Sequence, residues 1–337
     1  MVHLKEWFSL SDDTRRNIYT DTGNKIGLTP MAVEKDWWVV HALAVIFSMG
    51  CGGSLVFKGG TSLSKGWGLI ERFSEDIDLA LDREYLGYKG ELTKADVRRL
   101  RKESYSYVTE VFTTELSERF KAIGFEEVSI KYREVVNHDQ DPMIVEIYYP
   151  KLTEKDEYLK PGLLIEVGAR SLMEPYSLRT ISTFISQHQS DFSFVDEPIN
   201  IPAVNPERTF LEKVFLLHEG LQQPTEKIRI ERMSRHLYDV EMLSHTKHGT
   251  IALDNQELYY AIVDHRNKFN HISGIDYSKH NPQHIRIIPG DDILPEWETD
   301  YRQMQELMIY GDSLPFSDLI ESLTSLQTRI NAITWKQ

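Results

Sequence analysis

The pattern of apolar and polar positions divides the chain into a mixed first part and a helical second part. In the first part, apolar residues at helical spacing predict helices over 11–22, 30–48 and 93–122. Short apolar or alternating runs predict strands at 54–57, 76–81, 129–135, 143–149 and 163–167. We therefore expect an α+β fold, with a small mixed sheet that carries helices on one face.

The segment 187–206 separates the two parts, because it holds three prolines and lacks a periodic apolar pattern. Beyond it, helices are predicted at 206–221, 226–245, 254–272, 296–310 and 316–333. We expect one domain over residues 1–195 and a mostly helical domain over 196–337, which completes the active-site cleft.

The composition narrows the classes of function. A formal net charge of -14 argues against a surface that binds nucleic acid everywhere, but it allows a local basic groove. Cys51 is the single cysteine, so no intrachain disulfide can form, and a reducing cytoplasm fits. The N-terminal residues lack a signal-peptide pattern, and no apolar run is long enough to span a bilayer. We expect a cytoplasmic protein without a membrane partner.

Two aspartates mark the strand predicted at 76–81. Because side chains alternate along a strand, Asp76 and Asp78 point the same way, while Ile77 and Leu79 point into the core. Two carboxylates held so close repel each other, and a divalent cation relieves this repulsion. Mg²⁺ favours one or two carboxylates together with substrate phosphate oxygens. The pattern thus predicts a site for Mg²⁺, or Mn²⁺ in its place.

A third carboxylate on a neighbouring strand would complete a second metal site or deprotonate an attacking hydroxyl. Glu166 lies within an apolar strand, where a glutamate is costly unless it is paired or bound to metal. Glu146 is the competitor, although simple alternation in an edge strand explains it equally well. Both remain open, with Glu166 preferred.

A glycine pair precedes the two aspartates. Gly59 and Gly60 turn the chain from a strand into a short helix at about 61–68. Backbone N–H groups of Gly60 and Thr61 at a helix start favour an anion, and the hydroxyls of Thr61 and Ser62 add donors. Each feature alone is commonly structural, but a phosphate-holding turn followed by paired acids is what nucleotidyl transfer from an NTP requires.

The strings Lys58–Lys65 and Arg72–Leu79 resemble the nucleotidyltransferase superfamily of the DNA polymerase β type, and within it the AbiEii/AbiGii toxin branch. Fourteen residues separate Thr61 from Asp76, which is more than in the commonest members of the superfamily. From the residues themselves we expect Asp76, Asp78 and Glu166 to bind the metal. The resemblance adds nucleotide contacts from these residues: Gly59, Gly60, Thr61, Ser62, Lys65 and Ser74.

The helical part extends the resemblance. The string 207–217 is similar to a helix of the branch whose lysine falls on Lys213, and 234–243 to its Arg-Asp-x-x-Asp helix. Here His236 replaces the first aspartate, and Asp239 keeps the second. A lysine on a mostly apolar helix either reaches solvent or pairs with an anion, and we expect it to contact the triphosphate. Asp239 either lines the same cleft or forms a salt bridge between helices.

Four basic residues, Lys227, Arg229, Arg232 and Arg235, follow on the helix predicted at 226–245. They form either a phosphate-contacting wall, with Arg235 touching the nucleotide, or a solvated face balanced by neighbouring glutamates.

Taken with the resemblance, these features imply the toxin of a type IV toxin–antitoxin or abortive-infection system. It would transfer nucleotides from an NTP to an acceptor hydroxyl, with the 3′ end of a tRNA as one acceptor, and a separate antitoxin protein would neutralise it. The alternatives are a non-catalytic nucleotide-binding regulatory module and a transferase that nucleotidylates a protein.

Overall fold

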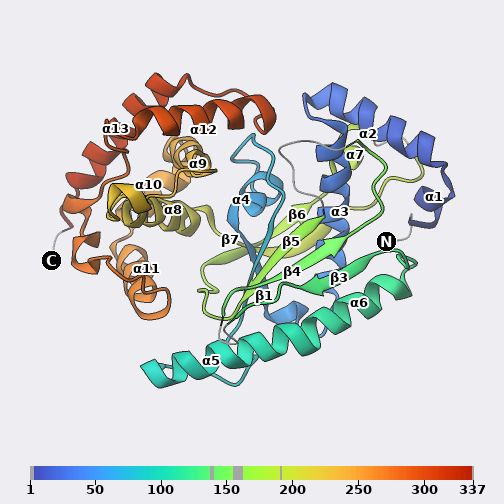
Figure 1. Cartoon of the computed structure of the whole chain (residues 1–337), viewed down its shortest axis with the longest axis horizontal. Coiled ribbons are helices and arrows are strands. Elements are labelled where there is room, and N and C mark those ends of the chain that lie inside the picture. The colour runs from blue at the N-terminus through green and yellow to red at the C-terminus, as the bar shows by residue number, and fades with distance from the viewer. Residues whose placement is uncertain (1–3, 137–139, 155–161, 190–191, 336–337) are drawn as a thin grey trace. The chain divides into compact units, whose positions relative to one another are not determined.

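The computed structural model describes residues 4–136, 140–154, 162–189 and 192–335. It divides into two compact units (Figure 1). The sheet unit comprises Met1–Trp67 and Phe73–Val204, and the helical unit comprises Gly68–Arg72 and Asn205–Gln337. The α+β class expected from the sequence is confirmed. The domain boundary at residue 195 stays a prediction, and the compact units divide between Val204 and Asn205.

The strands of the described residues form one seven-stranded sheet in the order β3-β4-β5-β2-β1-β7-β6. The pairs β2–β5 and β1–β7 are parallel, and the other neighbours are antiparallel, so the sheet is mixed. The strands are β1 (Leu55–Lys58), β2 (Ile77–Leu81), β3 (Ser129–Tyr132), β4 (Met143–Tyr148), β5 (Leu163–Gly168), β6 (Tyr176–Ile181) and β7 (Ile199–Val204).

The last two strands were not predicted from the sequence. β7 contains Pro202, which has no N–H to donate and therefore reads as a break. In the structure β7 pairs along its whole length with β6, whereas it meets β1 at the single pair Phe57 and Ala203. A strand that pairs fully on one side only tolerates the proline.

The helices of the sheet unit begin at strong capping signals. Thr29 accepts from the N–H of Ala32 ahead of Pro30, and Thr93 and Asp96 form a reciprocal capping box. The predicted helix 93–122 is found as α5 and α6 joined by a π-helical turn over Tyr107–Phe112. The helices are α1 (Leu4–Ser9), α2 (Asp12–Ile26), α3 (Pro30–Phe47), α4 (Gly59–Thr61), α5 (Lys94–Ser106), α6 (Thr113–Ala122) and α7 (Phe184–His188).

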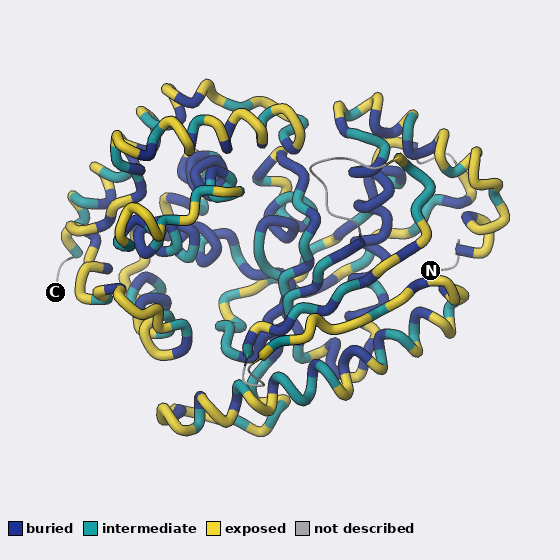
Figure 2. Tube along the Cα trace, in the orientation of Figure 1, coloured by how far each residue is buried: buried dark blue, intermediate teal, exposed yellow. Residues whose placement is uncertain are grey.

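The two faces of the central strands differ in burial (Figure 2). Ile77 and Leu79 of β2 and Ile165 of β5 are fully buried. Asp78 and Glu166, at the alternating positions, are half-buried. The chain thus keeps its apolar set on one face and leaves its carboxylates on the other, as a period of two dictates.

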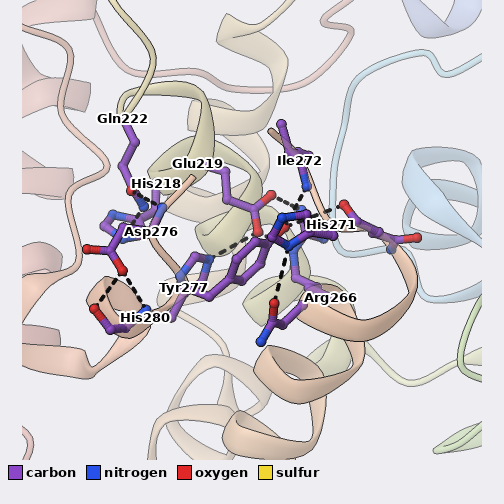
Figure 3. Close-up of polar contacts among 12 residues, drawn as sticks. His218, Glu219, Gln222, Arg266, His271, Ile272, Asp276, Tyr277 and His280 are labelled. Carbon is purple, nitrogen blue, oxygen red and sulfur yellow. Dashed lines mark hydrogen bonds and ion pairs between the residues drawn. The ribbon is translucent and has the colours of Figure 1, made fainter. Parts of the chain in front are cut away.

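The helical unit contains six α-helices within its described residues. They are α8 (Pro206–Gly220), α9 (Ser234–Ser244), α10 (Lys247–Asp254), α11 (Gln256–Phe269), α12 (Leu294–Leu307) and α13 (Phe316–Asn331). Its interior includes a charged network, in which buried Glu219 accepts from Arg266 and lies 3.0 Å from His280 Nε2 (Figure 3). No helix in the described part of the chain is both long and apolar enough to cross a membrane.

One predicted helix was wrong at its start. The spacing of residues 226–245 predicted a single helix, but α9 begins at Ser234. The carboxylate of Asp300 accepts from the backbone N–H of Arg232 at 2.6 Å and from that of Ser234 at 2.9 Å. Arg232 takes φ 61°, which no α-helix accommodates. Lys227, Arg229 and Arg232 therefore do not form a stripe with Arg235 on one helix.

Candidate active site

Gly59 brings the backbone into direct contact with a carboxylate of the neighbouring strand. Its φ of 79° lies in the left-handed region, and a Cβ built on it would lie 1.9 Å from Oδ2 of Asp78. Any side chain at this position would both strain the backbone and collide with the carboxylate. The glycine is therefore required by the close approach of the turn to Asp78.

Asp78 and Glu166 are neighbours across two parallel strands. The register of β2 and β5 pairs their Cα atoms directly, so both side chains leave the same face of the sheet. Glu146 pairs with Leu164 one strand farther out. Its carboxylate lies 2.9 Å from Nε of Arg133 and accepts from the hydroxyl of Tyr148 at 2.6 Å. The geometry thus favours Glu166 over Glu146 as the partner of Asp78.

Asp76 lies just before β2 rather than within it, and Thr61 fixes its backbone. The hydroxyl of Thr61, which is 1% exposed, donates to the carbonyl of Asp76 at 2.5 Å and lies 3.0 Å from Oγ of Ser74. Three residues expected at the nucleotide site are thereby brought together. Oγ of Ser62 is buried and has no hydrogen-bond partner among the described residues, which leaves a polar atom at the turn for a ligand.

These residues fit a magnesium ion that takes its remaining ligands from a substrate. Among the described residues, no three His, Cys, Asp or Glu side chains lie together in an arrangement that binds a metal. Mg²⁺ needs only one or two carboxylates when phosphate oxygens and water complete its shell. Asp78 and Glu166, paired in register, meet that requirement, and the metal site stays a prediction.

Helix α3 contributes buried charges that were not recognised from the sequence. Lys35 and Glu75, each at most 3% exposed, form a buried ion pair directly before Asp76. The carboxylate of Glu34 accepts from the N–H of Leu152 at 2.8 Å. A run of three charged residues inside an apolar helix was the available signal, because such groups are rarely buried without partners.

The third residue of that run holds Lys65. Nζ of Lys65 lies 2.5 Å from Oδ1 of Asp36, and the other carboxylate oxygen accepts from the N–H of Phe184 at 2.7 Å. Burial lowers the pKa of Lys65 and raises that of Asp36, and each partner only partly offsets the effect on the other. The ammonium also lies 3.9 Å from the centre of the Phe184 ring. Lys65 therefore anchors the turn to α3, and its contact with a nucleotide stays a prediction.

In the helical unit, the candidate residues form a second buried cluster. Asp239, fully buried, accepts from Nε and Nη2 of Arg72 at 2.7 Å each and from Nζ of Lys213 at 2.8 Å. The salt bridge between α8 and α9 considered from the sequence is thus present. Sequence patterns do not identify Arg72 as the partner of Asp239, because 167 residues separate the two.

The titration of this cluster follows from two cations around one carboxylate. Burial alone would raise the pKa of Asp239, but Arg72 and Lys213 outweigh it, so its pKa lies well below the ordinary value. Burial lowers the pKa of Lys213 despite the attraction of Asp239. Burial and the neighbouring cations also keep His236 neutral, with its pKa well below the usual range. Arg235 adds further positive potential at Lys213.

The segment that carries Arg72 is fixed within the helical unit by its backbone. The hydroxyl of Tyr238 accepts from the N–H of Glu71 at 3.2 Å, and the carbonyl of Glu71 accepts from the N–H of Tyr310 at 2.9 Å. Arg72 also pairs with Ile309 as an isolated bridge. The chain therefore enters the helical unit between the glycine turn and the acidic strand.

A glycine turn ahead of an acidic strand in a mixed sheet, followed by helices that carry the buried pair Lys213 and Asp239, points to the class of nucleotidyltransferases. The model of the nucleotidyl transferase AbiEii toxin family of type IV toxin–antitoxin systems matches residues 46–322. The chain belongs to this family and is a nucleotidyltransferase.

One solved structure found to be similar is the nucleotidyltransferase toxin MenT4 of Mycobacterium tuberculosis H37Rv. It is 14% identical, with coverage of 94% of this chain and 98% of that chain and a TM-score of 0.43. No curated protein matches the chain in sequence.

Proposed function

We propose that the protein uses Mg²⁺ to transfer nucleotides from an NTP to the 3′ hydroxyl of an RNA acceptor, with tRNA as the first candidate. The observation that carries this proposal is the in-register pair Asp78 and Glu166 beside the Gly59 turn. Two adjacent carboxylates on a half-buried face suit a divalent cation, and the turn supplies the close backbone approach that a phosphate needs.

Asp78 and Glu166 would hold the metal, which when bound neutralises charge on the triphosphate. Asp76 is the third ligand expected from the sequence, and that role stays a prediction, because no three acidic side chains of the described residues lie together in a metal-binding arrangement. Gly60 and Thr61 would donate backbone N–H groups to phosphate oxygens, with the hydroxyl of Ser62 as a further donor. Glu166 has a second role, because a carboxylate beside the acceptor hydroxyl accepts its proton. Ser74 supports this arrangement through its contact with Thr61.

The helical unit supports a role in binding anions. Around Asp239 two buried cations face one carboxylate, and Arg235 adds to the excess of positive charge. We propose that Lys213 stabilises charge on the triphosphate and that Asp239 holds the ammonium in place. Asp239 acts through Lys213 in this scheme.

In the cell, such an activity would make the protein toxic, and a cognate antitoxin would have to counter it. We place the protein in the cytoplasm, where NTPs and tRNA are available.

The test is to incubate the purified full-length chain with each of the four α-labelled NTPs, Mg²⁺ and total tRNA. We expect label on the RNA, and we expect the transfer to stop when the metal is chelated and to return when Mg²⁺ is added again. In Asp78→Asn the rate of transfer should fall about 10³-fold, because a metal contributes several kcal/mol to the stabilisation of the transition state. Asp82→Asn is the matched control, since Asp82 is also half-buried and lies directly after β2.

Three outcomes would overturn parts of the proposal. Label that survives Asp78→Asn removes the role of the carboxylate pair. Label on lysate proteins and not on RNA, read by mass spectrometry, identifies a transferase that modifies proteins. Metal-dependent NTP binding with no transfer to any acceptor identifies a non-catalytic regulatory module.

A further inference from the structure

The first turns of α5 concentrate positive charge on an acidic chain. Residues 94–102 hold five Lys or Arg and one acid, whereas the whole chain carries a net charge of -14. Lys94, Arg98 and Lys102 are all exposed, and their four-residue spacing aligns them along the helix. We call these three residues the α5 stripe.

The stability of the helix does not explain the α5 stripe. Like charges four residues apart repel each other and destabilise a helix. Cations in the first turns also oppose the helix macrodipole, which favours acids there. Asp96 and Glu103 fall about half a turn around the helix from Lys94, so they do not interleave with the stripe. Because the α5 stripe destabilises the helix, we look for its role in binding a ligand.

The opposite side of α5 fixes the direction in which the α5 stripe points. Val97 and Leu100 are buried, and the buried hydroxyl of Ser104 donates to Oδ1 of Asp141 at 2.9 Å. Asp141 in turn accepts from the backbone N–H groups of Ala169 and Arg170 after β5. The helix is thus anchored to the sheet, and its three cations face outward together.

The α5 stripe lies beyond the end of the sheet opposite the glycine turn. β1 and β2 are antiparallel, with Lys58 opposite Asp78 at one end and Leu55 opposite Leu81 at the other. The chain leaves for α5 after Leu81, and Figure 1 places α5 below the sheet and α4 above its other end. The length of β2 after Asp78 alone is about 10 Å, so a ligand that reaches both places is longer than one nucleotide.

We propose that the α5 stripe binds the phosphate backbone of the RNA acceptor while the 3′ end of that RNA reaches the carboxylate face. This inference rests on the proposed function and names the surface that holds its substrate. Lys and Arg neutralise phosphates without reading sequence, which suits a site that positions the body of a folded RNA. A local cluster of this kind is compatible with an acidic protein, because the field at a surface depends on how charge is distributed.

The experiment measures the affinity of the full-length chain for unfractionated tRNA by filter binding, without NTP, over a range of salt concentrations. In the triple variant Lys94→Gln, Arg98→Gln and Lys102→Gln we expect affinity at about 0.1 M salt to fall at least tenfold. The slope of log affinity against log salt should fall by about two to three. The control carries the same loss of charge at exposed positions elsewhere in the sheet unit: Lys25→Gln, Lys121→Gln and Lys131→Gln.

Two further measurements separate the explanations. The thermal midpoint of the stripe variant should equal or exceed that of the wild type, because repulsion along the helix is removed. Binding of NTP with Mg²⁺ should be unchanged. Equal losses in both triple variants would overturn the proposal in favour of bulk charge. Absence of tRNA binding by the wild type would also overturn the proposal. Binding of the α5 stripe to vesicles of phosphatidylserine in place of tRNA would then identify a membrane surface as its ligand.

The same experiment distinguishes failure of the proposed function. If tRNA binding depends on the α5 stripe but label is never transferred, the transfer activity is refuted and the RNA surface stands. If label is transferred to RNA equally well by the stripe variant and the wild type at low RNA concentration, the surface is refuted and the activity stands.

Discussion

The two compact units arrange charge in opposite ways around their candidate residues. On the sheet face, Asp78 and Glu166 are half-buried and adjacent, so two carboxylates lie side by side on a partly exposed surface. In the helical unit, Asp239 is fully buried and its charge is met by Arg72 and Lys213. The first arrangement brings two carboxylates together on a partly exposed face, whereas the second surrounds one buried carboxylate with two cations. Carboxylates therefore lie next to each other in one unit and hold buried cations in place in the other.

The largest effect on stability is expected from Asp239→Asn. This change leaves Arg72 and Lys213 buried without their counter-charge, and breaking a buried ion pair costs about 3–5 kcal/mol. Urea unfolding of the full-length chain, followed by circular dichroism, measures the loss. Asp78→Asn should leave the free energy of unfolding unchanged or raise it, because it removes one of two adjacent, half-buried negative charges. A loss of stability as large as that of Asp239→Asn would contradict this difference between the two units.

The second effect concerns the close approach of the turn to the strand. In Gly59→Ala the new Cβ would meet Oδ2 of Asp78, so we expect activity to fall about 100-fold, since displacing a reacting group by 1 Å has that effect. Transfer of label to RNA measures it. Gly53→Ala is the matched control, because a Cβ at Gly53 has nothing within 4 Å and its φ is ordinary. Equal activity of both variants would remove the requirement for glycine at 59.

A smaller loss is expected from Asp36→Asn. This change leaves one buried cation, Lys65, without its counter-charge, whereas Asp239→Asn leaves two. Lys65 also keeps its contact with the Phe184 ring. The cost should therefore be about 1–3 kcal/mol, the cost of leaving one buried donor unsatisfied. The double variant Asp36→Asn with Lys65→Met should recover part of that loss. A loss as large as that of Asp239→Asn would contradict the view that the number of cations sets the difference between the two centres.

The smallest effect is a difference in pH dependence, and its sign is opposite at the two centres. The folded pKa of Asp36 is raised, so its contribution to stability is present below the unfolded value of about 3.9 and is lost as pH rises through the folded pKa. The folded pKa of Asp239 is lowered, so its contribution is present above about 3.9 and is lost as pH falls toward the folded pKa.

Unfolding free energies measured between pH 3 and 7 check this difference. The gap between wild type and Asp36→Asn should widen from pH 7 to about pH 4. The gap for Asp239→Asn should stay flat over that range and shrink below it. Slopes of the same sign would contradict the opposite pKa shifts of the two carboxyl groups, and with them the view that burial outweighs Lys65 at Asp36.

The parts of the site that could be predicted depend on short stretches of sequence. The alternation of side chains along β2 predicted that Asp78 and Leu79 point to opposite faces, and the glycine pair predicted the turn. Partners far apart in sequence could not be found this way. Lys35 and Glu75 are 40 residues apart, and Arg72 and Asp239 are 167 residues apart.

The fold was predictable to a similar extent. Helical spacing located α3, α8 and the long helix that begins with α5. It failed before α9, where the carboxylate of Asp300 fixes the backbone of residues 232–234 in a turn. Tertiary hydrogen bonds of this kind override the local preference for helix, and they cannot be predicted from the pattern of residues 226–245.

The position of Arg72 has a consequence for how the protein is made. A ribosome adds about 5–20 residues per second, so the guanidinium emerges about 10–30 s before Asp239, which is 167 residues later. A fragment that starts at residue 205 lacks the guanidinium altogether. The buried cluster can therefore form only once nearly three quarters of the chain exists, and a prematurely terminated product would lack it.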